Sequence, residues 1–369
     1  MKHEKNNWII GIVDKKYKHP GAGRYTKFAQ YMNIEFMSSP VNFRFFKRKW
    51  LNKLEYYIFV RFSRGPSEHL NPYSFGLLVQ EIWALLKMKR SSGSVFHAVK
   101  GENDMHHLPR WSRGTDARLI ITFHDALDYF RHVSVDEKFL QNVDGVVALC
   151  ESQRKYFTSR MPPERVRVVH HGVDTVFFRP SFSQRKGNTV ISVGSYCRDH
   201  KVFSEAIPKV WELRPDVRFI LLGLATMPQS LPKRINDARI SYVDDVSDAT
   251  LLSLYHQADL AAISLWAATA NNALLEAMSC GLPVVATDIG GIREYAGEGT
   301  GIYTPPQDSD QFASAIVRIL DNPDEALSMG LTARDRAENL FDYKVTARAM
   351  QEFYDHICSM PQAPGDKNR

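Results

Sequence analysis

The sequence is poor in cysteine and has no long apolar segment. Its four cysteines, Cys150, Cys197, Cys280 and Cys358, stand far apart among 369 residues, and none forms a CxxC pair. This spacing excludes a cysteine-based zinc site and favours a reduced, cytoplasmic protein without disulfides. The longest apolar runs fall short of the roughly 18 residues that a membrane span requires. The first residues, MKHEKNNWIIGIV, contain too short an apolar core for a secretory signal peptide.

The composition is otherwise that of a globular protein. Hydrophobic residues make up 44% of the chain, and there is no low-complexity tract. A chain of 369 residues is long enough for two domains, each with its own core. The net charge of +6 suits anionic substrates, an anionic membrane surface or nucleic acid.

Strand and helix patterns alternate along the chain. In the first half, strands are expected within residues 8–13, 117–125, 143–149 and 165–174, with a Gly-rich turn and helical spacing at 18–32. This alternation is typical of a parallel sheet that is covered on both faces.

The same pattern restarts after residues 177–189, a polar stretch that contains Pro and Gly. Strands are expected at 190–194, 217–223, 259–265 and 283–287, and helices at 201–215, 248–258, 271–281, 310–322 and 343–357. We therefore predict two doubly wound, Rossmann-like α/β domains, 1–180 and 181–342, that face each other across a cleft. The last segment, 343–369, is expected to be a helix that packs back on the N-terminal domain.

The helix predicted at 271–281, NNALLEAMSCG, is apolar on nearly all faces but carries Glu276 about one turn inside. It begins with amide side chains suited to capping and ends at Gly281. A buried carboxylate is costly unless it is paired or hydrogen-bonded. Glu276 is therefore either a structural salt bridge or capping contact, or an acceptor for a ligand's vicinal hydroxyls. In the second case the ligand's phosphate would face the helix N-terminus.

The stretch LLEAMSCGLPVVATDIGGIREY, 274–295, resembles the signature of glycosyltransferase family 4, whose members are retaining enzymes with the GT-B fold. Other segments resemble the family in order, namely PGAGRYTKFAQYM, GVVALCESQRKYF, VISVGSYCRDHKVFSEAI and DATLLSLYHQADLAAISL. The resemblance is strongest between about 143 and 305. It implies a nucleotide-sugar donor bound in the C-terminal domain.

The resemblance also implies roles for individual residues. Glu276 would hold the ribose hydroxyls, and the backbone amides of Asn272 and Ala273 would face the diphosphate. Gly21 and Gly23 would let the backbone approach the phosphates. His124, in TFHD, would lie near the donor sugar; the alternative is a hydrogen-bonded histidine at a strand end.

Two positions depart from the family pattern. Position 268 is Ala, where the family has a Glu that contacts the donor sugar, so Asn271 or Asn272 is expected to take over, or the donor is unusual, or activity is lost. The family's Arg after the glycine of VG is replaced by Ser195. Counting back from the next helix puts Arg198 at the cationic position with Lys201 one turn on. The alternative for both is ordinary surface charge.

The chemistry implied is transfer of a sugar with stabilisation of the leaving group. A departing nucleoside diphosphate develops negative charge, which Arg198, Lys201 and the helix end at 272 are suited to meet. No carboxylate is placed like the sugar nucleophile of a retaining hydrolase, and the family route is front-face substitution. Neither histidine pair, His106–His107 or His170–His171, has metal-ligand spacing, so no metal is expected.

A basic, aromatic segment occupies residues 42–64 and includes Lys47, Arg48, Lys49 and Trp50. This composition suits an anionic membrane surface, where the acceptor would be lipid-linked. Nucleic acid would attract a similar segment, although the resemblance gives no reason to expect it as a partner. The alternative is a half-buried helix with a solvated basic face.

The function predicted is that of a metal-independent, retaining hexosyltransferase. It would move a sugar from a UDP- or GDP-sugar to a hydroxyl acceptor, such as a lipid-linked or cell-envelope glycan, with no cofactor besides the donor. It would be cytoplasmic, or peripheral at the inner face of the membrane. Ala268 keeps open the alternative of a non-catalytic GT-B scaffold that binds nucleotide or glycan, and a sugar-nucleotide epimerase would share the fold.

Overall fold

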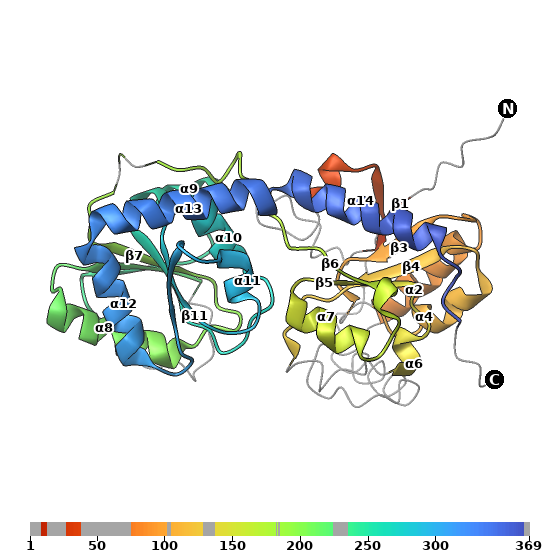
Figure 1. Ribbon diagram of the computed structural model, residues 1–369, viewed down its shortest axis with the longest axis horizontal. Coiled ribbons are helices and arrows are strands. Elements are labelled where there is room, and N and C mark those ends of the chain that lie inside the picture. The colour runs from red at the N-terminus through yellow and green to blue at the C-terminus, as the bar shows by residue number, and fades with distance from the viewer. Residues whose placement is uncertain are drawn as a thin grey trace, which may run out of the picture. The chain divides into compact units, whose positions relative to one another are not determined.

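The computed structural model describes residues 9–12, 27–37, 75–101, 105–127, 137–181, 183, 185–223 and 235–364. These residues separate into two compact units (Figure 1). The first unit holds the described residues up to Val169 and those from Ala347 onward, and the second unit is His170–Thr346. The chain therefore passes from the first unit to the second between Val169 and His170, before the polar stretch 177–189. It returns to the first unit after Thr346, within the last long helix.

The first unit is built on a parallel sheet. Its described strands are β1 (Ile9–Ile12), β2 (Ile34–Met37), β3 (Val95–Ala98), β4 (Arg118–Thr122), β5 (Gly145–Ala148) and β6 (Val166–Val168), in the order β2-β1-β3-β4-β5-β6. Its described helices are α2 (Phe75–Met88), α4 (Leu108–Trp111), α6 (Glu137–Leu140) and α7 (Glu151–Thr158), with 3-10 turns η2 (Lys27–Tyr31), η3 (Ser112–Gly114) and η4 (Pro163–Arg165). The sheet order is the flavodoxin-like one, extended by a strand.

The second unit is a second parallel sheet with its own helices. Its strands are β7 (Thr189–Val193), β8 (Arg218–Leu222), β9 (Ile240–Val243), β10 (Leu260–Ile263), β11 (Val284–Thr287) and β12 (Gly301–Thr304). Its helices are α8 (His200–Leu213), α9 (Asp248–Gln257), α10 (Asn272–Ser279), α11 (Ile292–Ala296), α12 (Ser309–Asp321) and α13 (Pro323–Phe341), followed by α14 (Tyr343–Ser359). The strand order β12-β11-β10-β7-β8-β9 is that of a Rossmann fold. The prediction of doubly wound α/β folds is confirmed.

Both faces of the second sheet are buried, because neighbouring residues along each strand enter different apolar clusters. In β10, Ala261 and Ile263 pack with α9, α10, α11 and α13, whereas Leu260 and Ala262 pack with α8 and α12. Figure 1 shows these two sets of helices on opposite sides of the sheet. Buried parallel strands read as nearly continuous apolar runs, which is why β7, β8, β10 and β11 were predictable.

Four strands were not anticipated from the sequence. The strands β2, β9 and β12 are sheet edges and are only partly buried, so their apolar pattern is weak. The strand β3 is fully buried but contains His97. The His97 ring is hydrogen-bonded to the Tyr354 hydroxyl at 2.6 Å and to the Thr122 hydroxyl at 2.7 Å. Burial lowers the pKa of His97 to about 3, so the ring is neutral and is accommodated in the core.

The order of strands in the second sheet creates a topological switch point between β7 and β10, which are neighbours although α8, β8, β9 and α9 separate them in sequence. The chain leaves these two strands in opposite directions, towards β8 and β11, so the carboxyl ends of β7 and β10 mark the switch point of the sheet. Ligands of doubly wound sheets bind at this point. The loops in question are residues 194–199 and 264–271, which carry the predicted site residues Arg198 and Asn271. No helix in the described part of the chain is both long and apolar enough to cross a membrane.

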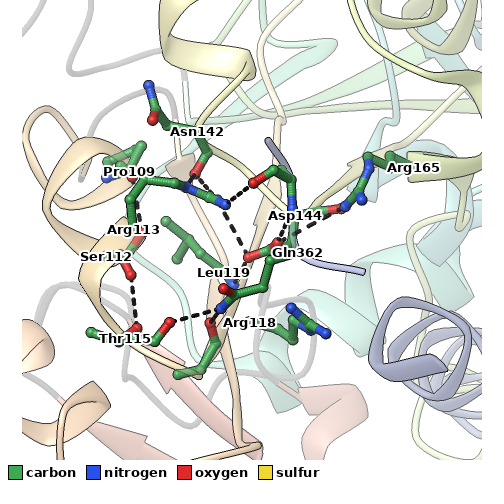
Figure 2. A network of polar contacts seen from close by, with 12 residues as sticks. Pro109, Ser112, Arg113, Thr115, Arg118, Leu119, Asn142, Asp144, Arg165 and Gln362 are labelled. Carbon is green, nitrogen blue, oxygen red and sulfur yellow. Dashed lines mark hydrogen bonds and ion pairs between the residues drawn. The ribbon is translucent and has the colours of Figure 1, made fainter. Parts of the chain in front are cut away.

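The C-terminal segment is hydrogen-bonded to the rest of the first unit around the carboxylate of Asp144 (Figure 2). Asp144 Oδ1 accepts a hydrogen bond from the Ala363 amide and Oδ2 accepts one from the Leu119 amide, both at 2.9 Å. Arg113 donates to the Ala363 carbonyl at 2.8 Å, and Arg165 donates to the Pro361 carbonyl at 2.6 Å. Both guanidinium groups also lie within 4.0 Å of the Asp144 carboxylate. The buried carboxylate of Asp144 therefore lies between two guanidinium groups and binds the C-terminal segment by a hydrogen bond.

Replacing Asp144 by Ala should destabilise the protein by about 3–5 kcal/mol, because it leaves two largely buried guanidinium groups without their carboxylate. Urea denaturation followed by circular dichroism measures the change. Glu352→Gln is the control, since Glu352 is exposed and lies 3.8 Å from Arg167, a surface pair expected to contribute less than about 1 kcal/mol. A wild-type midpoint for Asp144→Ala would show that the tail is held by other contacts.

Candidate functional site

The loop after β7 folds back over the end of its own strand. Gly194 has φ +88°, and a Cβ atom there would lie 3.1 Å from Nη2 of Arg198. Cys197 also has a positive φ, +57°, which is uncommon for a residue with a side chain. The two turns bring Arg198 beside β10, where it forms a bridge with Leu265, and the Trp266 amide donates to the Cys197 carbonyl at 3.1 Å. The loops after β7 and β10 are thus joined side by side.

Arg198 is a buried cation, with a relative exposure of 9%. Its guanidinium donates twice to the Val193 carbonyl, at 2.6 and 3.1 Å, and its Nη2 lies 3.5 Å from Oδ1 of Asn271. Within the described residues it has no carboxylate closer than 4.0 Å. Burial lowers its pKa to about 10, so it stays charged at neutral pH. The interpretation of Arg198 as ordinary surface charge is wrong.

Helix α10 starts next to this guanidinium. Asn271 is its N-cap, and Oδ1 accepts from the Leu274 amide at 3.1 Å. The Ala273 amide, one residue earlier, donates to no acceptor in the described part of the chain. At the other end of the helix, Arg334 donates to the Ser279 carbonyl at 2.7 Å and Arg185 to the Gly281 carbonyl at 2.9 Å. The negative end of the helix dipole is therefore balanced by cations, and the positive end points into the loops beside Arg198.

Glu276 lies inside the apolar layer that α10 forms with α9 and α13, and its exposure is 6%. Its Oε2 accepts a hydrogen bond of 2.9 Å from the Tyr255 hydroxyl. Within the described residues its Oε1 accepts none, and the side chain makes neither an ion pair nor a capping contact. Desolvation raises the pKa of Glu276 to about 7, against the opposing effects of Tyr255 and Arg198. A buried carboxylate with one uncommitted oxygen is suited to accept hydroxyl donors from a ligand.

At position 268, where the family pattern has an acid, the backbone lies against the loop after β11. Ala268 is partly buried against the apolar cluster of α10. Gly290 has φ +57°, and a Cβ atom there would lie 1.9 Å from the Ala268 carbonyl oxygen, so only glycine allows this approach. Asn271, expected as a substitute, uses Oδ1 for the helix cap, which leaves its Nδ2 as the group able to reach a ligand.

The remaining predicted residues are more dispersed. Lys201 lies in the first turn of α8 with 81% of its side chain exposed, 4.0 Å from Glu205, and it makes no hydrogen bond with Arg198 in the described structure. His124 follows β4 in the first unit, where its Nε2 is 2.7 Å from the Val99 carbonyl. Gly21, Gly23, Lys47, Arg48, Lys49 and Trp50 lie outside the described residues. The structure therefore brings together Arg198, Asn271, Asn272, Ala273 and Glu276.

Tyr255 is the residue at this site that sequence analysis did not single out. It lies on α9, is completely buried, and touches Glu276 across 21 positions of sequence. A tyrosine in an apolar helix is ordinarily part of the core, so its spacing gives no sign of a polar contact. Only the packing of α9 against α10 reveals it.

Two parallel doubly wound units, with a buried cation, a helix N-terminus and a buried acid at the switch point of the second, define a GT-B glycosyltransferase fold. Comparison with known proteins agrees. A family model described as "Glycosyl transferases group 1" matches residues 187–322, and one described as "Glycosyltransferase Family 4" matches residues 45–177. The two models together match well over half of the chain, and the chain belongs to this glycosyltransferase family.

The individual relatives share about a quarter of their aligned residues with this chain. A phosphatidyl-myo-inositol mannosyltransferase of Mycolicibacterium smegmatis is 26% identical over 261 residues, 66% of this chain and 67% of the relative. A glycogen synthase of Mycobacterium tuberculosis is 25% identical over 234 residues, 60% of this chain and 56% of the relative. The chain thus spans little more than half of the second relative's length.

Solved structures match nearly the whole fold. Sucrose-phosphate synthase from Thermosynechococcus elongatus has a TM-score of 0.68 at 18% identity, and the match covers 95% of this chain and 99% of that one. Anabaena HepE in complex with UDP has a TM-score of 0.69 at 19% identity, covering 94% and 99%. At these identities the structures establish the fold alone.

Replacing Glu276 by Gln should weaken binding of a nucleoside diphosphate while stabilising the protein without ligand. The folded-state pKa of about 7 lies above the ordinary 4.5, so the folded state holds a proton that the unfolded state has lost between these values. Stability therefore falls as pH rises from about 4.5 to 7, by up to about 3 kcal/mol, and stays low above pH 7. Gln removes this cost, so the variant should melt higher than wild type at pH 8 and equally at pH 4.

Thermal melts from pH 4 to 8 and calorimetric titration with UDP or GDP measure the two effects. Glu205→Gln is the matched control, because Glu205 lies on α8 with its side chain 47% exposed. If Glu276→Gln melts lower than wild type at pH 8, the carboxylate is a structural anchor instead of a ligand-binding group.

Proposed function

We propose that the chain transfers a sugar from a UDP- or GDP-sugar to a hydroxyl acceptor, with retention at the anomeric carbon and without a metal ion. The observation that carries the proposal is the buried Arg198 guanidinium beside the N-terminus of α10 at the switch point of the second sheet. A cation that the described residues leave without a carboxylate, next to a helix N-terminus, is suited to an anionic ligand.

The proposed division of labour follows from these positions. Arg198 and the first amides of α10 stabilise the charge that develops on the diphosphate as the sugar leaves. The uncommitted oxygen of Glu276 accepts hydrogen bonds from the ribose hydroxyls, and Asn271 Nδ2 is left to contact the sugar. Lys201, whose exposed side chain is long, and His124 complete the proposed set, together with Gly21 and Gly23. Positive charge from the chain itself takes the place that a divalent cation holds in other sugar transferases.

Retention is proposed without a covalent sugar–enzyme intermediate. Glu276 is buried and hydrogen-bonded to Tyr255, and position 268 is occupied by Ala. The acceptor would then attack the face from which the diphosphate departs, and the departing phosphate would take the acceptor's proton.

The relatives support the donor and acceptor classes. The HepE structure is a complex with UDP, and the mannosyltransferase relative is named for phosphatidyl-myo-inositol. By extension we propose a nucleotide-sugar donor and a sugar or lipid-linked acceptor for this chain.

A second candidate is a non-catalytic GT-B scaffold that binds nucleotide or glycan. One observation favours it, namely that Ala268 is packed against the apolar cluster while its carbonyl is covered by Gly290. The alanine at this position offers no acid to a donor sugar.

UDP or GDP at millimolar concentration should raise the melting temperature, because ligand binding to the folded state stabilises it by mass action, by about 2.7 kcal/mol at 100 times Kd. Incubation with a panel of UDP- and GDP-sugars, with and without EDTA, should then release the nucleotide at equal rates. A thermal shift without release would support the scaffold. Absence of any shift would contradict nucleotide binding altogether, and loss of release in EDTA would contradict the metal-free reaction.

For the basic segment 42–64 we propose contact with an anionic membrane surface at the cytoplasmic face. Each Lys or Arg near such a surface contributes about 1 kcal/mol, screened by salt. Replacing Lys47, Arg48 and Lys49 by Ser should therefore release the protein from anionic vesicles and leave nucleotide binding unchanged. Co-sedimentation with vesicles of anionic or neutral lipid, at low and high salt, measures this. Wild-type protein that stays in the supernatant with both lipids would refute the membrane proposal.

A further inference from the structure

The hydroxyl of Tyr255 has one strong contact, the Glu276 carboxylate. Tyr255 lies in the last turn of α9 and is completely buried, with its ring edge against Phe178 at 6.0 Å between centroids. Its hydroxyl is 2.9 Å from Glu276 Oε2 and 3.5 Å from the Ala273 carbonyl oxygen. The first contact is a good hydrogen bond and the second is at the limit of one. The ring is fixed by the core, so the hydroxyl is a rigid donor.

A rigid donor restricts the flexible glutamate side chain. Glu276 has three rotatable bonds, and its other oxygen, Oε1, accepts no hydrogen bond from the described residues. The hydrogen bond from Tyr255 to Oε2 therefore restricts the orientation of the carboxylate and leaves Oε1 as its second acceptor. Among the described residues, Tyr255 is the one that donates a hydrogen bond to this side chain.

The surroundings of Glu276 shift its pKa in opposite directions. Desolvation and Asp248, at the start of α9, raise its pKa, whereas the Tyr255 hydrogen bond and Arg198 lower it. Burial raises the pKa values of Cys280, at the end of α10, and Tyr343, at the start of α14, and the nearby charge of Glu276 raises both further. Because both stay neutral near pH 7, Tyr255 and Arg198 are the groups that favour the ionised carboxylate. Arg198 acts through space, and Tyr255 acts by contact.

We propose that Tyr255 is a positioning residue that fixes the orientation of Glu276 and keeps its carboxylate in the form that accepts a ligand's hydroxyl pair. The role rests on the proposed nucleotide-sugar function of this site. Tyr255 would not touch the ligand and would act only through Glu276. Its effect on binding should therefore depend on pH.

The test is Tyr255→Phe, which keeps the buried ring and removes only the hydroxyl. Without the hydrogen bond, the Glu276 pKa should rise by about one unit, which is a tenfold change in the ionisation equilibrium. UDP affinity, measured by calorimetry from pH 6 to 9, should fall about fivefold at pH 7, because the ionised fraction of Glu276 falls from about one half to about one tenth, and the difference from wild type should narrow towards pH 9. Tyr303→Phe is the control, since Tyr303 is half-buried in the same unit and its hydroxyl binds the Gly297 carbonyl and Thr300.

A second measurement separates this inference from the proposed function. The carboxyl carbon of Glu276 can be titrated by NMR in protein labelled with ¹³C-glutamate, with Glu276→Gln to assign the signal, and no ligand is needed. An upward shift of that titration in Tyr255→Phe, in a protein that binds no nucleotide, would sustain the positioning role and refute the proposed function. An unchanged titration, or a loss of affinity that is equal at all pH values and accompanied by a lower melting temperature, would show that Tyr255 is structural only.

Discussion

The second unit is organised by two opposite charges that are buried near the N-terminus of α10 and hydrogen-bonded mainly to neutral groups. Arg198 donates to the Val193 carbonyl, and Glu276 accepts from the Tyr255 hydroxyl. Burial of ionised groups is expensive unless each is compensated. For Arg198 the compensation comes from the Val193 carbonyl, and Gly194 leaves space for the guanidinium beside it.

Two of the buried acids in the described part of the chain, Asp144 and Glu276, illustrate the difference between a structural carboxylate and one proposed to bind a ligand. Both oxygens of Asp144 accept backbone amides, and two guanidinium groups balance its charge. Glu276 has one hydrogen bond in the described structure and a pKa raised by desolvation. The first arrangement stabilises the fold. The second costs stability and leaves one carboxylate oxygen without a hydrogen bond from the described residues, which is the feature behind the ligand-binding role proposed for Glu276.

The departures from the family pattern have structural counterparts at the switch point. Ser195 replaces the expected arginine, and Arg198 reaches the end of β7 from three residues farther along because the chain turns at Cys197. Ala268 replaces the expected acid, and its carbonyl lies against Gly290. A cation is thus present at the end of β7 from a different position in the loop, whereas position 268 carries an apolar side chain in place of the acid.

The sequence by itself determined the alternation of strands and helices, the position and cap of α10, and the unusual burial of Glu276. Such features depend on local periodicity and on capping residues close in the chain. It did not determine the edge strands β2, β9 and β12, nor β3, whose apolar run is broken by His97. Only the tertiary structure decided that Tyr255 meets Glu276, that Arg198 is buried beside Asn271, and that Asp144 holds Ala363. These contacts join residues 21, 73 and 219 positions apart. They exist because strand order and helix packing bring distant segments together, and no local pattern records that order.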